Sequence, residues 1–487
     1  MDSSQSDTFP YPVPRGTFRV DPRTQPRSAG GPVNIMTLAS TSPDYMWVSS
    51  TSGVRYVDVK DGGFRTVAEM TAPGVQTVPV ADLDRVLGER FTDLNQVRQA
   101  VEGDWKLNAR ALGNGTYSLV GADNRLYYST SDSRILTFEL VNPKDPSAGI
   151  QVADSVDFKQ FFAAAAIDGP IPETTVGLAM TYDGHLVVAT TKSVSVINRD
   201  LSGEPSQVYF AKDETVSNSV AVDERGGIYV ASDQLMRKLV WTGTKLSDDS
   251  ADGAWAAPYD TGQQPPSVKF GGGTGSTPTL MGFGNDVDQL VVITDGSDQM
   301  KLVAFWRDLI PEDAVPLPAA KSIRIADQIP VTAGLSPLPP FIQSEQSVVV
   351  NNYGAFVVNN IRPQGDPDRL VDVLAGGPVL DPPRGMQRFE WDPATNRFQS
   401  VWARGDVVAT SMVPAASSVS DMVMVNGYTK PDGWEVTGLD WGSGETVQRV
   451  IFGQDNLGNG AYALIQYAPN GDLLFNGVGG TFRAKLG

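Results

Sequence analysis

The stretch TYDGHLVVAT, Thr181–Thr190, contains the pattern that decides the fold. A short apolar run, VGLAMTY, precedes an Asp-Gly pair, and a second apolar run, HLVVATT, follows it. An Asp-Gly pair between two such runs is typical of a tight β-hairpin turn. KSVSVINRD comes next and predicts a third strand. The segment therefore predicts a small antiparallel sheet made from consecutive strands.

The same phrase recurs along the chain. Its copies begin at Asp44, Asn124, Gly184, Gly226, Asp288, Gly354, Asp421 and Gly471. A second phrase, a strand that runs into a polar turn, begins at Arg55, Thr137, Val194, Arg237, Leu302, Gln387 and Val436. The final TFRAKLG would supply an eighth copy of this second phrase, cut short by the chain end. Repeated small sheets that cannot bury both faces alone are expected to stack on one another around an axis.

We therefore predict an all-β fold: a single β-propeller of eight four-stranded antiparallel blades, with seven blades as the alternative count. Two stacked all-β domains are the other alternative. Residues 1–16 are predicted to be a flexible linker and residues 17–487 the propeller, closed by a strand at residues 17–20 that pairs as the outer strand of the last blade. Residues 82–103, with apolar side chains at helical spacing, and residues 152–168, which contain FFAAAA, are predicted as helical insertions.

The composition excludes several classes of site. The chain has no cysteine and one histidine, which removes disulfides, thiolate nucleophiles, iron–sulfur clusters and histidine-rich metal sites. Lys and Arg number 38 against 56 Asp and Glu, a net charge of −18, so binding to nucleic acid is not expected. No apolar run is long enough for a transmembrane helix. The remaining chemistry is that of carboxylates, amides and hydroxyls, with calcium as the metal that such groups would hold.

The only histidine, His185, occupies a loosely specified position of the repeat. Tyr45, Arg125, Gly227 and Gln289 stand there in other copies. We predict that it lies in the turn between the innermost and the second strand, at the mouth opposite the expected ligand site. A structural or surface role is therefore favoured over the alternative, a catalytic or pH-sensing histidine.

The expected site lies at the mouth formed by the connections between blades and by the turns between second and third strands. Its ligand-binding candidates are Glu214, Asn218, Ser276, Thr277, Glu345 and Asn456. The catalytic candidates are Asp233, Asp295 and Glu173, and the metal candidates are Asp233, Asp295 and Asp298. Carboxylates that converge at one mouth could hold calcium or share acid–base work. The alternative is a set of solvated polar turns.

Two segments resemble the repeat of the pyrroloquinoline-quinone-type propellers. GWEVTGLDWGSGETVQRV, residues 433–450, resembles the turn of that repeat, and residues 276–306 follow its rhythm of a proline-led inner strand, a second strand, an Asp-Gly turn and a third strand. The resemblance implies the fold. The quinone is not expected as a cofactor, because this chain lacks the vicinal disulfide common in quinone-dependent dehydrogenases of that family.

A third segment, SNSVAVDERGGIYVASDQL, residues 217–235, resembles a blade of the gluconolactonase-type propellers. Those hydrolases hold a calcium ion in the central channel with Glu, Asn and Asp. The resemblance implies that Asn218 and Asp233 occupy matching positions, and no other residue of this chain matches.

Tryptophan recurs at one position of the repeat, the end of the third strand. It is found there in four copies, at Trp241, Trp306, Trp391 and Trp441. We predict that these rings pack between blades, with a stacking platform for a sugar or another flat ligand as the alternative.

Together these features predict an exported binding propeller without a redox cofactor, which holds a small molecule, a saccharide or a protein at its channel mouth. The first alternative is a calcium-assisted hydrolase, lyase or isomerase that uses Asp and Glu in the channel, and the second is a quinone-dependent dehydrogenase. The polar, proline-rich start is compatible with a periplasmic or extracellular protein whose leader has been removed, and a cytoplasmic location fits the sequence as well.

Overall fold

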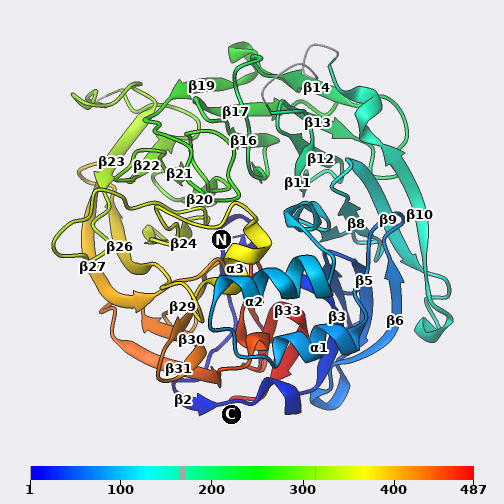
Figure 1. The fold of residues 1–487 in the computed structure, drawn as a ribbon. Helices are drawn as coiled ribbons and strands as arrows, with labels where there is room; N and C mark the ends of the chain where they lie inside the picture. The colour runs from blue at the N-terminus through cyan, green and yellow to red at the C-terminus, as the bar shows by residue number, and fades with distance from the viewer. Residues whose placement is uncertain (1, 164–170, 313) are drawn as a thin grey trace.

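The computed structural model describes residues 2–163, 171–312 and 314–487. Its strands form seven hydrogen-bonded sheets that surround a central axis in a propeller-like ring (Figure 1). In the sheets formed by β11–β14 and by β20–β23, the first strand lies nearest the axis and the fourth lies farthest from it. The predicted all-β class and the antiparallel four-stranded sheets are confirmed.

Five of the sheets consist of consecutive strands. The first two comprise β7 (Leu119–Val120), β8 (Leu126–Ser129), β9 (Arg134–Leu140) and β10 (Ile150–Asp157), then β11 (Thr175–Met180), β12 (Leu186–Thr190), β13 (Ser193–Ile197) and β14 (Ser206–Tyr209). The third comprises β15 (Ala221–Val222), β16 (Gly227–Ala231), β17 (Leu235–Trp241) and β18 (Leu246–Ser247), with β19 (Trp255–Pro258) also paired to β17. The fourth and fifth comprise β20 (Thr279–Met281), β21 (Leu290–Thr294), β22 (Lys301–Trp306) and β23 (Ile325–Pro330), then β24 (Val349–Asn351), β25 (Gly354–Val358), β26 (Arg384–Asp392) and β27 (Arg397–Val408).

The other two sheets contain six strands each and include segments from the beginning of the chain. One has the order β1 (Thr8–Phe9), β28 (Ala415–Ser417), β29 (Met422–Thr429), β30 (Gly433–Asp440), β31 (Thr446–Gly453), β2 (Gly16–Arg19). The other has the order β32 (Ile465–Tyr467), β33 (Leu473–Ala484), β3 (Arg27–Ala39), β4 (Tyr45–Ser50), β5 (Gly53–Asp58), β6 (Arg65–Thr71).

The second strand of each sheet is apolar at consecutive positions because both of its faces are buried. Along β12, Leu186 and Val188 belong to the hydrophobic core shared with the preceding sheet. Val187 and Ala189, which point the opposite way, belong to the core shared with the following sheet. Alternate side chains of a strand point to opposite faces, so this pattern requires a neighbouring sheet on each side. The first repeated phrase of the sequence therefore indicates a strand that is packed between two neighbouring sheets.

The Asp-Gly pair of the opening stretch forms the predicted turn. Gly184 has φ +90°, a conformation that side chains on L-residues rarely adopt, and its N–H donates to the carbonyl of Thr181 at 2.9 Å. The turn carries the chain from β11 into β12. His185 follows it directly, so its predicted place between the innermost and second strands is confirmed.

Strand β3 pairs with two different neighbours. Its first half, Arg27 to Val33, pairs with β33, and its second half, Asn34 to Ala39, pairs with β4. TFRAKLG does not form a separate third strand as predicted, because Thr481 and Phe482 continue β33 and pair with β3. The predicted closing strand at residues 17–20 is also wrong: β2 pairs in parallel with β31 of the preceding sheet. The C-terminal strand, β33, pairs with β3 instead.

The predicted linker, residues 1–16, is wrong for most of its length. Val222 N–H donates to the Gln5 side chain, Val350 N–H to the Ser6 carbonyl and Ala416 N–H to the Asp7 carbonyl, at 2.8–3.0 Å. These donors lie on innermost strands of three sheets, so the segment spans the centre of the ring (Figure 1). The innermost strand is an edge of its sheet, so its outer backbone N–H and C=O groups have no partner within the sheet. These groups bind the N-terminal segment.

Helices occupy the connections rather than the sheets. The α-helices are α1 (Val80–Leu87), α2 (Leu94–Arg98) and α3 (Arg369–Ala375). A π-helical turn covers Gln99–Asp104, and short 3₁₀ turns cover Ser3–Gln5, Pro22–Thr24, Lys60–Gly62, Ala109–Gly113, Pro146–Ala148, Phe158–Phe161, Ser250–Asp252 and Asn456–Gly458. The helical insertion predicted at residues 152–168 is wrong for residues 152–157, which belong to strand β10 because each of them except Ala153 pairs with β9. Only the 3₁₀ turn Phe158–Phe161 is helical among its described residues, and residues 164–168 lie outside the described residues.

The described helices are too short and too polar to cross a membrane.

Candidate functional site

Three helices gather on the face of the ring that carries the connections between sheets. We call this the upper face, and the face with the turns between first and second strands the lower face. Apolar side chains of α1, α2 and α3 form one hydrophobic core there, which includes Leu83, Val97 and Leu370. Figure 1 shows these helices over the centre of the ring. They make the upper face asymmetric, and the polar cavity described next lies at the edge of α3.

Helix α3 is positioned by its first residues. The Asp368 carboxylate caps the helix by accepting hydrogen bonds from the N–H groups of Leu370 and Val371 at 2.9 and 3.3 Å. Its other oxygen accepts from the N–H of Ala109, in the connection that carries α1 and α2. An aspartate at this position satisfies backbone donors that the first helical turn leaves free. Asp368 therefore fixes both the start of α3 and its place beside the other helices.

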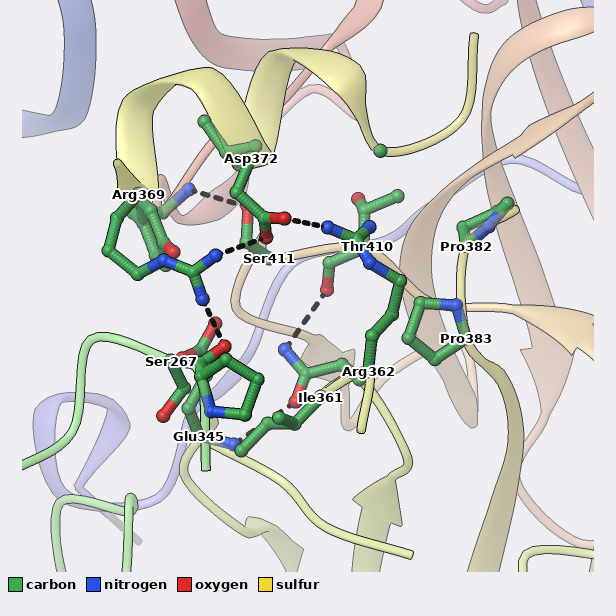
Figure 2. Close-up of a pocket in the computed structure, with 15 residues that line it drawn as sticks. Ser267, Glu345, Ile361, Arg362, Arg369, Asp372, Pro382, Pro383, Thr410 and Ser411 are labelled. Carbon is green, nitrogen blue, oxygen red and sulfur yellow. Dashed lines mark hydrogen bonds and ion pairs between the residues drawn. The ribbon is translucent and has the colours of Figure 1, made fainter. Parts of the chain in front are cut away.

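A cavity of about 40 Å³ lies against α3 and is called the upper-face cavity here. Its walls come from five connections between strands, which Figure 2 shows meeting around α3. The residues that line it are Pro266, Ser267, Glu345, Asn360, Ile361, Arg362, Arg369, Asp372, Val373, Gly376, Pro382, Pro383, Thr410, Ser411 and Tyr462. Most of these side chains are polar or charged, which is unusual for a space left in the interior by imperfect apolar packing.

Two arginines of the cavity share one carboxylate. Asp372 binds Arg362 through Oδ1 and Arg369 through Oδ2, the latter at 2.9 Å, and Figure 2 shows it between the two guanidinium groups. Arg369 also donates to the carbonyls of Pro266 and Asp366. Two positive charges against one negative charge leave an excess of one positive charge at this wall.

Each of the two arginines keeps a buried donor without an acceptor. Among the described residues, the Nε–H groups of Arg362 and Arg369 make no hydrogen bond. A buried donor that has lost water and gained no partner costs roughly 1–3 kcal/mol. The wall therefore favours an occupant that brings oxygen acceptors.

Glu345 stands across the cavity from α3. Its Oε2 accepts from the N–H of Val268 at 3.1 Å, and its own N–H donates to the Asn360 side chain at the same distance. Burial raises the pKa of Glu345 to about 7, and that hydrogen bond and the Arg369 charge offset only part of the effect. Its carboxyl group therefore exchanges its proton near neutral pH.

The rest of the polar wall consists of hydroxyl and amide groups. The Asn360 amide donates to the Thr410 carbonyl at 3.3 Å, and Ser411 Oγ accepts from the N–H of Tyr462 at 3.3 Å (Figure 2). As the acceptor in that bond, the Ser411 hydroxyl keeps its own proton for another partner. Burial raises the pKa of Tyr462 well above its usual value, so its hydroxyl stays protonated.

Of the residues predicted for the site, only Glu345 lines this cavity. Asn218 and Thr277 lie together at another place, where Tyr117 Oη donates to Asn218 Oδ1 at 2.6 Å and accepts from Thr277 Oγ1 at 3.4 Å. Ser276 is buried and bonded to Thr294 and the Gln346 carbonyl. Ser276 therefore has a structural role.

Two further ligand-binding candidates are also used by the fold. Glu214 forms a two-pronged ion pair with Arg237 at 2.6 and 2.7 Å and accepts from Ser232. Asn456 donates to the carbonyls of Leu87 and Glu89 at 3.2 and 3.0 Å, which ties it to the end of α1. Neither side chain is available to a ligand in this arrangement.

The catalytic and metal candidates do not converge. Asp295 binds Lys301 Nζ at 2.8 Å, Asp233 accepts from the N–H of Thr215 at 2.8 Å, and Asp298 is exposed. Burial raises the pKa of Asp295 and of Asp233. Within residues 2–163, 171–312 and 314–487, no three Asp, Glu or His side chains are placed to share a metal ion, so these residues do not fit the calcium site.

Glu173 differs from the other candidates. Its Oε1 accepts from Thr190 and Ser193 at 2.6 and 2.9 Å, while its Oε2 is buried and unbonded in the part of the chain that the structure describes. The residue lies beside segment 164–170, which is not described, and it does not line the upper-face cavity.

The upper-face cavity was missed because its charged wall lies in a segment without a repeat counterpart. That segment lies between β25 and β26 and matches neither of the two repeated phrases. The signal was present: Asp368 precedes Leu370, Val371 and Leu374, the spacing of a capped amphipathic helix. Arg362 and Arg369 flank that cap.

His185 lies on the lower face, away from this cavity. It lines a groove of about 480 Å³ with Asp183 and Arg199 among its other walls. Nδ1 of His185 lies 3.0 Å from Asp183 Oδ1, and its ring packs against Trp241 with centroids 4.9 Å apart. Burial alone would raise the pKa of Asp183, but hydrogen bonds from Thr181, His185 and Trp241 lower it to about 2. The histidine is thus held between two sheets.

The recurring tryptophans pack between sheets, as predicted. Trp241 Nε1 donates to Asp183 of the preceding sheet at 2.9 Å, and Trp391 Nε1 donates to Asp288 of the preceding sheet at 2.8 Å. Trp306 packs edge-on against Trp391, with ring centroids 5.8 Å apart. These rings are used by the contacts between sheets, which leaves no stacking platform at this position of the repeat.

Comparisons with known proteins give no activity for this chain. No family model matches the chain. An uncharacterized protein of Archaeoglobus fulgidus is 36% identical over 310 residues, which are 61% of this chain and 58% of that protein. The chain thus spans somewhat more than half of the length of this curated relative.

Solved propeller-type structures are similar at the level of the fold alone. They include Saccharomyces cerevisiae Sqt1 (9% identity, TM-score 0.48, 98% of this chain and 99% of that chain) and a europium-containing methanol dehydrogenase (10%, 0.44, 96% and 84%). A third is the Pseudomonas aeruginosa periplasmic gluconolactonase PpgL (14%, 0.43, 88% and 97%). The resemblance to quinoprotein and gluconolactonase propellers is therefore one of fold.

Proposed function

We propose that this protein is a ligand-binding propeller whose binding site is the upper-face cavity. The observation that carries the proposal is the convergence of Arg362, Arg369 and Glu345 on one cavity, where both arginines keep a buried Nε–H without an acceptor among the described residues. Binding pockets are concave and contain a few charged or polar groups at fixed positions. A ligand with oxygen acceptors would supply the partners that these arginines lack.

Binding is favoured over catalysis because the other polar groups of the upper face are bonded to one another within the fold. The strongest ion pairs of the upper face, such as Glu214 with Arg237 and Asp295 with Lys301, hold strands and turns together. A general base needs to lie within hydrogen-bond reach of a nucleophile or a bound water. Glu345 is the one predicted candidate that faces the cavity, and its bonded partner is the Val268 backbone.

We also propose that the ring is an eight-bladed propeller closed by β3. One six-stranded sheet conceals the eighth blade, because β3 belongs to one ladder with β33 and to another with β4. Divided at the register shift of β3, the six-stranded sheet with β32 and β33 becomes two blades. Pairing of the C-terminal strand with an N-terminal strand would close the ring without leaving an open edge. An extracytoplasmic location stays a prediction from the sequence.

The proposed function is tested by thermal unfolding against a panel of small molecules. The panel contains sulfate, acetate, neutral amino acids, monosaccharides and calcium chloride. A ligand present at about 100 times its Kd stabilises the folded state by roughly 2.7 kcal/mol. At least one class is expected to raise Tm.

Two variants locate the binding. Ser267→Leu and Ser411→Leu fill the cavity from different sides, and each is expected to abolish the shift. Ser202→Leu adds the same side chain in an exposed turn of the lower face and is expected to leave the shift unchanged. A shift that survives both cavity variants would place the binding elsewhere and refute the proposal.

A further inference from the structure

The upper-face cavity combines hydrogen-bond donors with a single exchangeable carboxyl group, and this combination indicates the class of ligand. Resting on the proposed function, we infer that the cavity binds a small oxyanion and that Glu345 makes this binding weaken as the pH rises. The two parts of the inference follow from different walls of the cavity.

The donors come from α3 and from the facing loops. Arg362 and Arg369 each have a buried Nε–H without an acceptor among the described residues. Ser411 accepts a backbone hydrogen bond, and so its hydroxyl proton is free to be donated. Charged donors on planar guanidinium groups suit carboxylate, sulfate and phosphate oxygens.

The charge of the wall favours an anion over a neutral guest. Among the residues that the structure describes, Asp372 is the only carboxylate bound to the two arginines, so one positive charge of the pair stays uncompensated at that wall. The whole chain carries a net charge of −18, so the site is a local exception on an acidic molecule. An anion has to be attracted to this wall more strongly than the acidic surface of the protein repels it. This condition favours a small anion that enters the cavity over a large polyanion on the surface.

Glu345 sets the pH response. In its neutral form the carboxyl group donates a hydrogen bond to an oxyanion, and in its ionised form it repels one. Burial raises the pKa of Glu345 to about 7, so the change occurs near neutral pH. The charged and titratable groups around it are Lys269, Arg369, Asp372, Tyr117 and Tyr462.

Lys269 is the neighbour whose titration overlaps. Its Nζ donates to the Gly273 carbonyl and to the Gln343 side chain at 2.8 Å. Burial lowers the pKa of Lys269 to about 8, so its loss of charge overlaps the upper part of the range in which Glu345 ionises. A variant at Glu345 separates the two effects, because any pH response of Lys269 persists in it.

The test is calorimetric titration of the full-length protein with sodium sulfate between pH 6 and pH 8, at constant ionic strength in chloride. Sulfate keeps its charge over this range, so a change of affinity belongs to the protein. With a carboxyl pKa of about 7 and binding confined to the neutral form, Kd is expected to rise about tenfold from pH 6 to pH 8. Acetate and phosphate, measured at pH 6, show whether the site prefers organic acids or inorganic oxyanions.

Two variants of matched chemistry complete the experiment. Glu345→Gln keeps a donor at every pH, and its sulfate Kd is expected to change by no more than about twofold over the range. Asp7→Asn removes another carboxyl group whose pKa is raised to about 7, outside the cavity, and its pH profile is expected to match that of the unaltered protein. Ser411→Ala, which keeps Glu345, is expected to weaken sulfate at all pH values with the same slope.

The outcomes separate the two proposals. Sulfate binding with an unchanged slope in Glu345→Gln would overturn the role of Glu345. Binding of a sugar or amino acid that Ser267→Leu abolishes, with no oxyanion binding, would overturn the ligand class and leave the proposed function standing. Absence of every shift and every titration heat would overturn both.

Discussion

Trp391 Nε1 donates a 2.8 Å hydrogen bond to Asp288 Oδ2 across the boundary between two adjacent sheets. Both residues are buried, and Asp288 lies in the turn between β20 and β21 while Trp391 lies on β26. Burial raises the pKa of Asp288, and the indole donor offsets part of that effect. The same contact recurs between Trp241 and Asp183. A polar bond at the rim of an apolar core fixes the register of one sheet against the next.

Removal of this bond is expected to destabilise the protein modestly. Trp391→Phe keeps an aromatic ring but loses the N–H, and the expected cost is roughly 1–3 kcal/mol because Asp288 is left without its donor. Urea denaturation measures the free energy of unfolding. The double variant with Asp288→Asn is expected to show coupling of about 0.5 kcal/mol or more. Additive losses would mean that the contact contributes nothing specific.

Asp7 is expected to make stability depend on pH. Burial raises its pKa from 3.8 to about 7, so the folded state binds the proton more tightly than the unfolded chain does. Stability from this group is therefore complete below pH 4 and is lost as the pH rises through 7. Asp7→Asn is expected to raise Tm at pH 8 and to have little effect at pH 4. Asp298→Asn, an exposed control, is expected to change Tm at neither pH; equal Tm values for Asp7→Asn and the unaltered chain at pH 8 would contradict the buried placement.

The cap of α3 is expected to affect both stability and the cavity. Asp368→Ala removes the acceptor for Leu370 N–H and Val371 N–H, at an expected cost of about 1 kcal/mol. Hydrogen exchange should become faster across α3. Asp93→Ala removes the corresponding cap of α2 and serves as the matched control. Ligand binding is expected to be weaker in Asp368→Ala than in Asp93→Ala, since only α3 carries Arg369 and Asp372. Equal effects of the two variants on binding would argue against a site beside α3.

The stacked strands could be predicted from the sequence because their signal is local. Leu186 to Ala189 are apolar at every position, and the Asp-Gly turn before them is short-range chemistry. The pairing of Arg27 with Phe482 carries no such signal, since it joins residues far apart in the chain. The burial of the N-terminal segment could not be predicted from local patterns either, because Ser6 and Thr8 are polar residues yet are buried against innermost strands.

The site was predictable in part. Its place on the upper face and Glu345 followed from the repeat, because the connections between sheets and the turns between second and third strands share that face. Arg362 and Arg369 lie in a segment that occurs once, so no comparison between repeats could expose them. Their meeting with Ser267 and Ser411 depends on how three connections fold over the ring, which is a property of the assembled structure.

One diffraction experiment tests the central claim most directly. Crystals of the full-length protein are soaked in sodium selenate at pH 6, and data are collected at the selenium absorption edge. The account predicts an anomalous peak in the upper-face cavity, within hydrogen-bond reach of Arg362 or Arg369 and of Ser411. Selenate bound elsewhere with the cavity filled by ordered water, or no anomalous peak at all, would contradict it.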